Sequence, residues 1–334
     1  MTHKMSINHK KSLHQSIILI IALSLLSAAC NNVQPQNQPV GGADTGLRNT
    51  PTNTTTPSPI PTQIQAFNSS RALENVAYQV ALGPRIPGSE AHDKLVDWIQ
   101  SELSQAGWES EMQETSMMNQ PIRNIIGRWG KGRPWIILGA HYDSRIVADR
   151  DPNPENQLKP VLGANDGASG VAVLLELARI LPDYAKELRA GQIWLVFFDA
   201  EDNGNIPGYD WILGSRAFVD SLTDYPDSVV IVDMVGDINQ EIYQEANSDP
   251  KLTSEIWAKA AELGYSDRFI VQPGNSIIDD HLPFIQLGIP AVDIIDINYP
   301  HWHTADDTLD KISALSLKVV GDTLLTWLTN KSGK

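Results

Sequence analysis

The sequence has very little cysteine, with Cys30 as the single example among 334 residues. One thiol excludes an intrachain disulfide framework. Basic residues are also outnumbered, because 25 lysine and arginine residues stand against 40 aspartate and glutamate residues. The formal net charge of −15 leaves no evident basic surface to replace the counterions of a nucleic acid, so we expect no nucleic-acid partner. Residues 65–334 also lack an apolar run of transmembrane length.

The first 30 residues have the three parts of an export signal. Lysines precede an apolar run over residues 17–26, and small residues then lead to Cys30. This arrangement resembles a bacterial lipoprotein signal, in which the cysteine becomes lipidated and amino-terminal, although Ser27 replaces the usual leucine. We therefore expect an exported protein. It is either a cell-envelope lipoprotein that meets the membrane only through a lipidated Cys30, or a secreted or periplasmic protein whose ordinary signal is cleaved.

The remaining chain divides into a tether and a folded body. Residues 31–64 are rich in Asn, Gln, Pro and Thr with almost nothing to bury, which predicts a disordered tether. Residues 65–334 contain no linker and no internal repeat, and we predict one domain. Apolar patterns indicate strands at 108–115, 122–129, 135–140, 193–198, 229–235 and 291–297, and helices at 69–82, 89–106, 170–181, 251–263, 281–287 and 315–328. This alternation predicts an α/β fold, a three-layer αβα sandwich around a mixed, mostly parallel sheet.

The stretch from residue 193 to residue 202 is the centre of the functional prediction. Residues 193–198 are an unbroken apolar run, which indicates a strand covered on both faces. Asp199, Glu201 and Asp202 follow immediately. Ligands of open α/β sheets bind beyond the carboxyl ends of strands, where neighbouring carboxylates can hold a cation and move a proton. The same acids are equally compatible with a loop that caps the next helix.

Four further segments place a metal-ligand residue type near a predicted strand or helix end. His141 follows a buried strand, and Asp166 lies among small residues just ahead of a helix. Asp233 is a charge in an apolar strand, and His301 and His303 follow the last strand. Each has a simpler explanation alone, as a hydrogen-bonded histidine, a helix cap or a member of a buried ion pair. Together they supply the nitrogen and oxygen ligands that suit zinc.

The order of these residues resembles that of the zinc-dependent aminopeptidases and of their relatives, the glutaminyl-peptide cyclotransferases. The resemblance runs from about Ala72 to Leu328 and is most specific in residues 139–145, 163–170, 197–202 and 279–284, with extensions at 288–290 and 302–304. In the aminopeptidases, residues matching His141, Asp166 and Asp233 hold one zinc. Residues matching Asp166, Asp202 and His303 hold the other zinc, and Asp166 bridges the two. The cyclotransferases hold one zinc ion, and it is bound by the second trio alone.

Two features favour the cyclotransferases, which include bacterial members of the animal type. Asp279 matches an acid of their catalytic hydrogen-bond network, although Asp279 is also explained as a helix cap. Trp302 matches a tryptophan of their substrate pocket. One departure is Asp202, because the animal enzymes have glutamate there. The loop 203–213 does not match the animal enzymes, so a place for Trp211 in the pocket stays open.

The resemblance implies a single zinc-dependent catalytic domain over residues 65–334. Its expected reaction converts the N-terminal glutamine of peptides or proteins to pyroglutamate and releases ammonia. One zinc on Asp166, Asp202 and His303 would be the Lewis acid, Glu201 the general acid and base, and Asp233 and Asp279 members of the catalytic network. Two alternatives remain, a di-zinc aminopeptidase that also uses His141 and Asp233, and a non-catalytic surface lipoprotein that binds a ligand.

Overall fold

Six strands form one mixed sheet at the centre of the structure, a computed structural model that describes residues 65–329. The strands are β1 (Glu109–Met117), β2 (Gln120–Gly130), β3 (Trp135–His141), β4 (Gln192–Phe198), β5 (Ser228–Asp233) and β8 (Ala291–Ile295). They lie in the order β1-β2-β4-β3-β5-β8. β3 is parallel to β4 and β5, and β5 is parallel to β8, whereas β2 runs antiparallel to β1 and β4. The predicted α/β fold with a mixed sheet is confirmed.

The predicted signal segment over residues 1–30 and the predicted tether over residues 31–64 lie outside the described residues. Lipidation of Cys30 and the boundaries of the catalytic domain therefore stay predictions. Among residues 65–329, every helix is too short or too polar to pass through a lipid bilayer.

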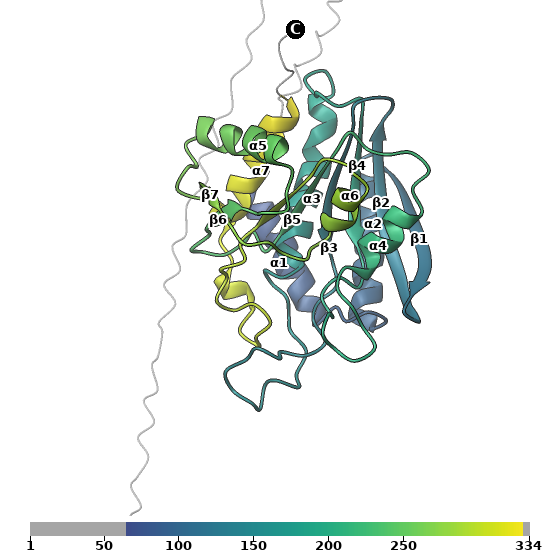
Figure 1. Cartoon of the computed structure of the whole chain (residues 1–334), viewed down its shortest axis with the longest axis vertical. Coiled ribbons are helices and arrows are strands. Elements are labelled where there is room, and N and C mark those ends of the chain that lie inside the picture. Colours follow the sequence, from purple (N-terminus) through teal and green to yellow (C-terminus); the bar gives the residue numbers. More distant parts are fainter. Residues whose placement is uncertain (1–64, 330–334) are drawn as a thin grey trace, which may run out of the picture. The chain divides into compact units, whose positions relative to one another are not determined.

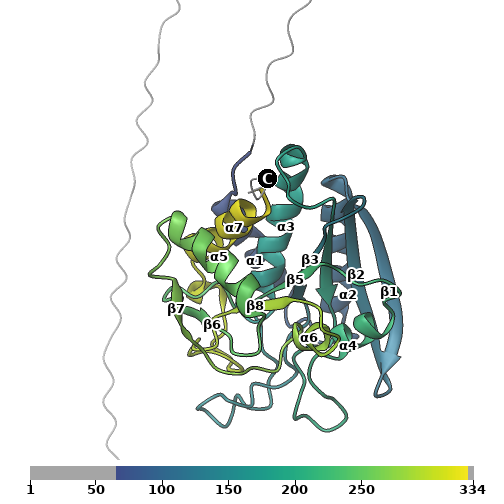
Figure 2. The same cartoon turned by 45° about the horizontal axis from the view of Figure 1, so that its top comes forward.

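Helices cover both faces of the sheet and give the predicted three layers (Figures 1 and 2). Alternate side chains of β3 show how the two faces are filled, since Ile136 and Leu138 join the larger apolar cluster and Trp135 and Ile137 join the smaller one. The larger cluster lies under α1 (Ser69–Leu82), α2 (Glu90–Gln105), α3 (Ala168–Ile180), α5 (Pro250–Glu262) and α7 (Ala314–Thr329). The smaller cluster lies under α4 (Leu213–Asp220) and α6 (Leu282–Gln286).

The predicted helices are confirmed, with capping that the sequence explains. Asn68 accepts hydrogen bonds from the backbone N–H groups of residues 70 and 71, and Ser89 accepts one from His92 N. Strand ends were predicted less well, and two of the errors bear on the site. The strand predicted at 229–235 ends at Asp233, because Met234 has a left-handed φ of 45°, and the strand predicted at 291–297 ends at Ile295.

One α-helix and two strands were not predicted. Helix α4 follows a loop that carries no clear apolar period. Strands β6 (Ile242–Gln244) and β7 (Phe269–Pro273) pair in parallel as a separate two-stranded sheet. β6 has only three residues, which is too short for a period-two pattern to be recognised. This small sheet matters below, because the loops that leave it reach the candidate site.

Gly170 explains why helix α3 approaches the sheet so closely. A Cβ atom added at Gly170 would lie 2.1 Å from the carbonyl oxygen of Val232 in β5 and 3.0 Å from the Cβ of Ala140 in β3. The first of these contacts is with backbone, which cannot swing aside as a flexible side chain can. The absence of a side chain at this position therefore places the start of α3, and Asp166 just before it, against the ends of β3 and β5.

We expect Gly170→Ala to lower the free energy of unfolding by about 2 kcal/mol, because overpacking a buried helix–sheet contact forces the backbone apart. Urea unfolding followed by circular dichroism measures the change. Gly321→Ala is the matched comparison in another buried helix, where the new Cβ would meet the ring of Phe67, a side chain that can move. An unchanged free energy of unfolding in Gly170→Ala would contradict the packing argument.

Candidate metal centre

The predicted ligand residues converge at one end of the central sheet. The carboxyl ends of four adjacent strands, β4-β3-β5-β8, meet there because these strands are parallel. The residues are His141 at the end of β3, Asp166 before α3, Glu201 and Asp202 after β4, Asp233 at the end of β5, and His303 after β8. The structure brings all six together, although more than 160 residues separate the first from the last.

Two trios of ligand-type side chains share Asp166. In the first trio, Nε2 of His141 lies 3.1 Å from Oδ1 of Asp166 and 3.1 Å from Oδ1 of Asp233. In the second, Nε2 of His303 lies 2.8 Å from Oδ1 of Asp202 and 3.6 Å from Oδ2 of Asp166. Within each trio the ligand-type atoms lie no more than 4.8 Å apart. Asp166 presents one oxygen to each trio, as a carboxylate that bridges two positions would.

The chemistry of the second trio fits a zinc ion. Oδ2 of Asp166 and Oδ2 of Asp202 are buried and accept no hydrogen bond from the protein, which is costly for a carboxylate oxygen. One imidazole nitrogen and two carboxylates are also a donor set that zinc accepts in a tetrahedral site with one open position. The separations of 2.8 and 3.6 Å from His303 Nε2 are close to those between ligands that lie about 2 Å from a common zinc ion.

The acid–base properties of the site indicate an excess of buried negative charge. Burial, together with the charge of Asp166, raises the pKa of Asp202 to about 6. Burial likewise raises the pKa of Asp233 to about 7, against the opposing charge of His141. These carboxyl groups bind protons more tightly than free ones do because burial and the neighbouring carboxylates outweigh the nearby histidines, so proton binding neutralises part of the negative charge. A divalent cation in the same place would perform that neutralisation.

The environment of Glu201 indicates a different role from that of its neighbour Asp202. It is absent from both trios of ligand-type atoms. Burial, reinforced by the charges of Asp279 and Asp202, raises the pKa of the Glu201 carboxyl well above its usual value. A carboxyl group with a raised pKa accepts a proton more readily than an ordinary carboxylate does, so it is suited to exchange protons with a substrate.

Asp143 organises the turn that carries Glu201 and Asp202. Its Oδ1 accepts a hydrogen bond of 3.0 Å from Glu201 N, and its Oδ2 accepts one of 3.3 Å from Asp202 N. Oδ1 also lies 3.4 Å from Nδ1 of His141, so Asp143 can set the orientation of that imidazole ring. Asp143 was not predicted as a site residue. Its position two residues after His141 was the available signal.

Three residues at the site have a left-handed backbone, which non-glycine residues rarely adopt. They are Ala200 with φ 53°, Met234 with φ 45° and His303 with φ 59°. Met234 follows the candidate ligand Asp233, His303 is itself a candidate ligand, and Ala200 precedes Glu201. Such strain persists only where the surrounding structure enforces it, and it is commonly found at functional sites.

A cavity of about 280 Å³ opens beside the second trio. Both Trp302 and Asp279 line it, and Asp279 is only 3% exposed. His301 belongs to neither trio and instead packs its ring edge-on against Tyr299 at 5.4 Å. The full lining is Asp166, Glu201, Asp202, Trp211, Asp233, Met234, Asn275, Ser276, Ile277, Ile278, Asp279, Ile295, Ile297 and Trp302.

Trp211, which the sequence left open, lies in this cavity. Its ring is stacked on that of His303, with centroids 5.9 Å apart and planes inclined by 18°. Arg145 also contacts Trp211, since its guanidinium lies 5.2 Å from the Trp211 ring and donates a 2.6 Å hydrogen bond to the carbonyl of Asp202. Gly204 leaves the room for the indole, because a Cβ there would lie 2.0 Å from it. Sequence patterns could not reveal these contacts.

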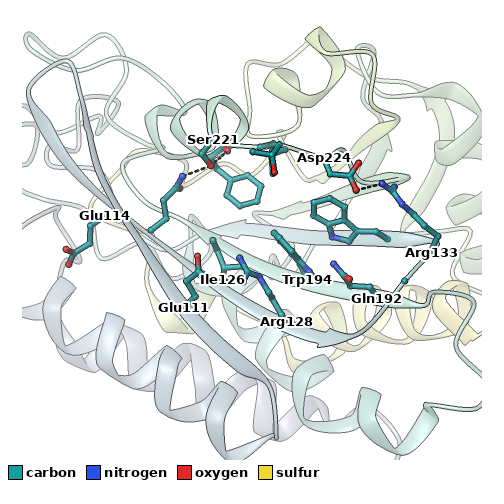
Figure 3. Close-up of a pocket in the computed structure, with 15 residues that line it drawn as sticks. Glu111, Glu114, Ile126, Arg128, Arg133, Gln192, Trp194, Ser221 and Asp224 are labelled. Carbon is teal, nitrogen blue, oxygen red and sulfur yellow. Dashed lines mark hydrogen bonds and ion pairs between the residues drawn. The ribbon is translucent and has the colours of Figure 1, made fainter.

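A larger cavity of about 610 Å³ lies elsewhere, over the amino-terminal ends of β3 and β4. Figure 3 shows Trp194, Arg128 and Glu111 around it, and Arg128 lies 4.3 Å over the Trp194 ring. Arg133 is paired with Asp224 at 2.7 Å. None of the metal-ligand trios among residues 65–329 belongs to this cavity. The smaller cavity beside the trios is therefore the candidate active site.

Comparison with known proteins agrees with this geometry. A family model described as peptidase family M28 matches residues 124–328. The chain is 35% identical to a glutaminyl cyclase of Tannerella forsythia, with a TM-score of 0.75 over 80% of this chain and 100% of that one. It is 33% identical to a leucine aminopeptidase precursor of Bacteroides thetaiotaomicron, with a TM-score of 0.76 over 81% of this chain and 99% of that one.

An animal relative is more distant. The glutaminyl-peptide cyclotransferase of Drosophila melanogaster is 26% identical over 264 residues, which cover 69% of this chain and 72% of that protein. The resemblance to bacterial and animal cyclotransferases expected from the sequence is confirmed. The family model alone spans well over half of the described residues. The chain belongs to peptidase family M28.

Proposed function

We propose that this protein is a zinc-dependent glutaminyl-peptide cyclotransferase that converts the N-terminal glutamine of peptides to pyroglutamate and releases ammonia. The position of Asp279 carries the proposal. This buried carboxyl lines the same cavity as Glu201 and Asp233 and adds an acid that lies outside both trios around Asp166. The 35% identity to the bacterial glutaminyl cyclase supports it.

The cavity suits one short, uncharged side chain together with its α-amine. Its volume of about 280 Å³ is at the small end of ligand pockets. Ile277, Ile295, Ile297 and the two tryptophans supply apolar walls, whereas the carboxylates gather on the side of the trios. The negative charge there attracts the amino terminus of a peptide, and the apolar walls hold the methylene groups of a glutamine side chain.

The second trio would hold the zinc ion through Asp166, Asp202 and His303. When bound there, zinc supplies Lewis-acid polarisation of the substrate's side-chain carbonyl. Glu201 accepts a proton from the α-amine as the nitrogen forms its bond to the side-chain carbonyl carbon. Glu201 then delivers a proton to the amide nitrogen as that carbon–nitrogen bond breaks, so ammonia leaves and the carboxylate is regenerated.

Asp233 and Asp279 complete the catalytic group in this proposal. Both are buried beside Glu201, and hydrogen bonds from reacting nitrogen atoms to their carboxyl groups would steady the intermediate. The attacking and attacked atoms belong to one substrate molecule. Folding that molecule against Trp302 and Trp211 therefore supplies much of the acceleration by holding the α-amine close to the side-chain carbon.

A di-zinc aminopeptidase is the second candidate function. The observation that favours it is the intact first trio of His141, Asp166 and Asp233, whose atoms lie as close together as those of the second. The 33% identity to the leucine aminopeptidase precursor points the same way. In that reaction Glu201 would act as the base for the water that attacks the first peptide bond.

One paired assay tests the proposal. Purified protein is given a glutaminyl peptide and a leucyl chromogenic amide, and zinc per chain is measured on the same sample. We expect ammonia release from the glutaminyl peptide, no leucine release, and about one zinc per chain. Leucine release with two zinc ions per chain would replace the proposal by the aminopeptidase. If neither ammonia nor leucine is released, the remaining interpretation is a protein that binds a ligand without catalysis.

A further inference from the structure

Glu245 is a buried carboxylate that belongs to neither trio. It lies between β6 and α5 and is 4% exposed. Its two oxygens accept hydrogen bonds from the backbone N–H groups of Asn247 (2.9 Å), Ser248 (2.8 Å) and Ile277 (2.9 Å), and from the Ser248 hydroxyl (2.8 Å). Nε2 of His281 lies 3.1 Å from Oε2. These contacts connect Glu245 to two parts of the candidate site.

The first part is the wall of the substrate cavity. Residues 275–278 form that wall, and Glu245 holds it through the N–H of Ile277. The neighbouring residues reinforce the contact, since Ala246 N donates to Asn275 O at 3.0 Å and Asn247 Nδ2 donates to both Glu245 Oε1 at 3.0 Å and Ile277 O at 3.1 Å. The hydrogen bonds that hold the wall therefore come largely from the loop that carries Glu245.

The second part is the group of buried side chains next to Asp279. His281 is fully buried, with Nε2 facing Glu245 and Nδ1 lying 3.8 Å from Oδ2 of Asp293 in β8. Ligand-type atoms of Asp279, His281 and Asp293 all lie within 4.8 Å of one another. Glu245 also reaches β8 through Ser248, whose hydroxyl accepts a 3.0 Å hydrogen bond from Asp293 N.

We propose that Glu245 is a positioning residue that sets the wall of the substrate cavity through Ile277 and the orientation of Asp279 through His281 and Asp293. The inference rests on the proposed function for the role of Asp279, and on contacts alone for the role of the wall. No residue of the two trios around Asp166 takes part in it.

The carboxylate form is needed because only donors face Glu245. Four N–H and O–H groups besides His281 and the Asn247 side chain converge on its two oxygens. Those hydrogen bonds and the nearby His281 outweigh the opposing effect of burial and lower the pKa of Glu245 to about 2. A glutamine of the same shape would offer one oxygen and turn an NH₂ group toward donors, which leaves buried N–H groups unpaired.

Glu245→Gln is therefore the test variant, and Glu176→Gln is the matched control. Glu176 is also fully buried and accepts hydrogen bonds from Asn68 N at 2.8 Å and from Arg179, but it lies on α3 away from the cavity. For Glu245→Gln we expect a KM about tenfold higher and a kcat about tenfold lower, with zinc content unchanged. For Glu176→Gln we expect both constants to stay as in the wild type.

A second measurement separates positioning from a general loss of structure. In an Asp279→Asn background, Glu245→Gln should no longer lower kcat, because the residue through which it acts is already disabled, whereas KM should still rise. A structural defect would instead lower kcat by the same factor in both backgrounds and leave KM unchanged. That result would overturn the proposal, as would unaltered kinetics in the single variant.

Hydrogen exchange distinguishes this proposal from the proposed function. Amides of residues 274–281 should exchange at least about tenfold faster in Glu245→Gln, whatever reaction the protein catalyses. Wild-type protein that releases no ammonia would refute the cyclotransferase but not the wall contact. Equal exchange in Glu245→Gln and wild type would refute the role of Glu245, even in an active cyclotransferase.

Discussion

Replacing Glu201 by glutamine is expected to lower kcat for a glutaminyl peptide by about 10³-fold while zinc stays bound. Glutamine keeps the shape of the side chain but cannot accept and return a proton. The factor corresponds to about 4 kcal/mol of transition-state stabilisation. Ammonia release, coupled to a glutamate dehydrogenase readout, gives kcat, and plasma emission spectrometry gives zinc per chain.

The structure explains why the metal should survive this substitution. Glu201 lies outside both trios, whereas its neighbour Asp202 lies 2.8 Å from His303 Nε2. The backbone N–H of residue 201 still reaches Asp143, so the turn that presents Asp202 is retained. Full activity in Glu201→Gln would exclude Glu201 as the proton carrier. Loss of zinc along with activity would instead make it a ligand.

The second large effect is expected when either of the two histidines is replaced, and the zinc content of these variants shows how many metal ions the protein binds. For a single-zinc cyclotransferase, His303→Gln should reduce zinc from about one per chain to nearly none, because it removes the only nitrogen ligand of the second trio. His141→Gln should leave about one zinc per chain. Emission spectrometry on dialysed protein measures both, and thermal unfolding verifies that each variant is folded.

A different pattern identifies the aminopeptidase arrangement. Two zinc ions in the wild type, with one retained in each histidine variant, would mean that both trios are filled. The shared residue provides the control for either case. Asp166 offers one oxygen to each trio, so Asp166→Ala should remove all zinc whether the wild type holds one ion or two.

The location of the site was predictable because it depends on strand ends. An apolar run that stops at charged residues marks the carboxyl end of a buried strand, and such ends share one edge of a parallel sheet. His141, Asp233 and the pair Glu201–Asp202 were found in this way, and the structure places them together. The resemblance to a known family was still needed to assign different roles to Glu201 and Asp202. Both are acids directly after the same strand, and the sequence pattern alone does not distinguish them.

The support around the site was not predictable from local pattern. Trp211 reaches His303 only because Gly204 leaves space for its ring, a contact between parts of a loop with no periodicity. Asp293 lies inside an apolar strand that is predicted as simple core, and its polar neighbours His281 and Asp279 come from a different segment. Such relations are set by tertiary packing, which a single sequence does not encode in any short window.

The wide spacing of the ligands along the chain has a consequence for how the protein folds. The second trio joins residues 166, 202 and 303, and β4, β3, β5 and β8 must already lie side by side before the three can meet. Closing such long loops is slow and entropically costly. The ion therefore cannot serve as a folding nucleus. It acts instead by mass action on the finished fold, raising stability in proportion to the logarithm of its concentration above the dissociation constant.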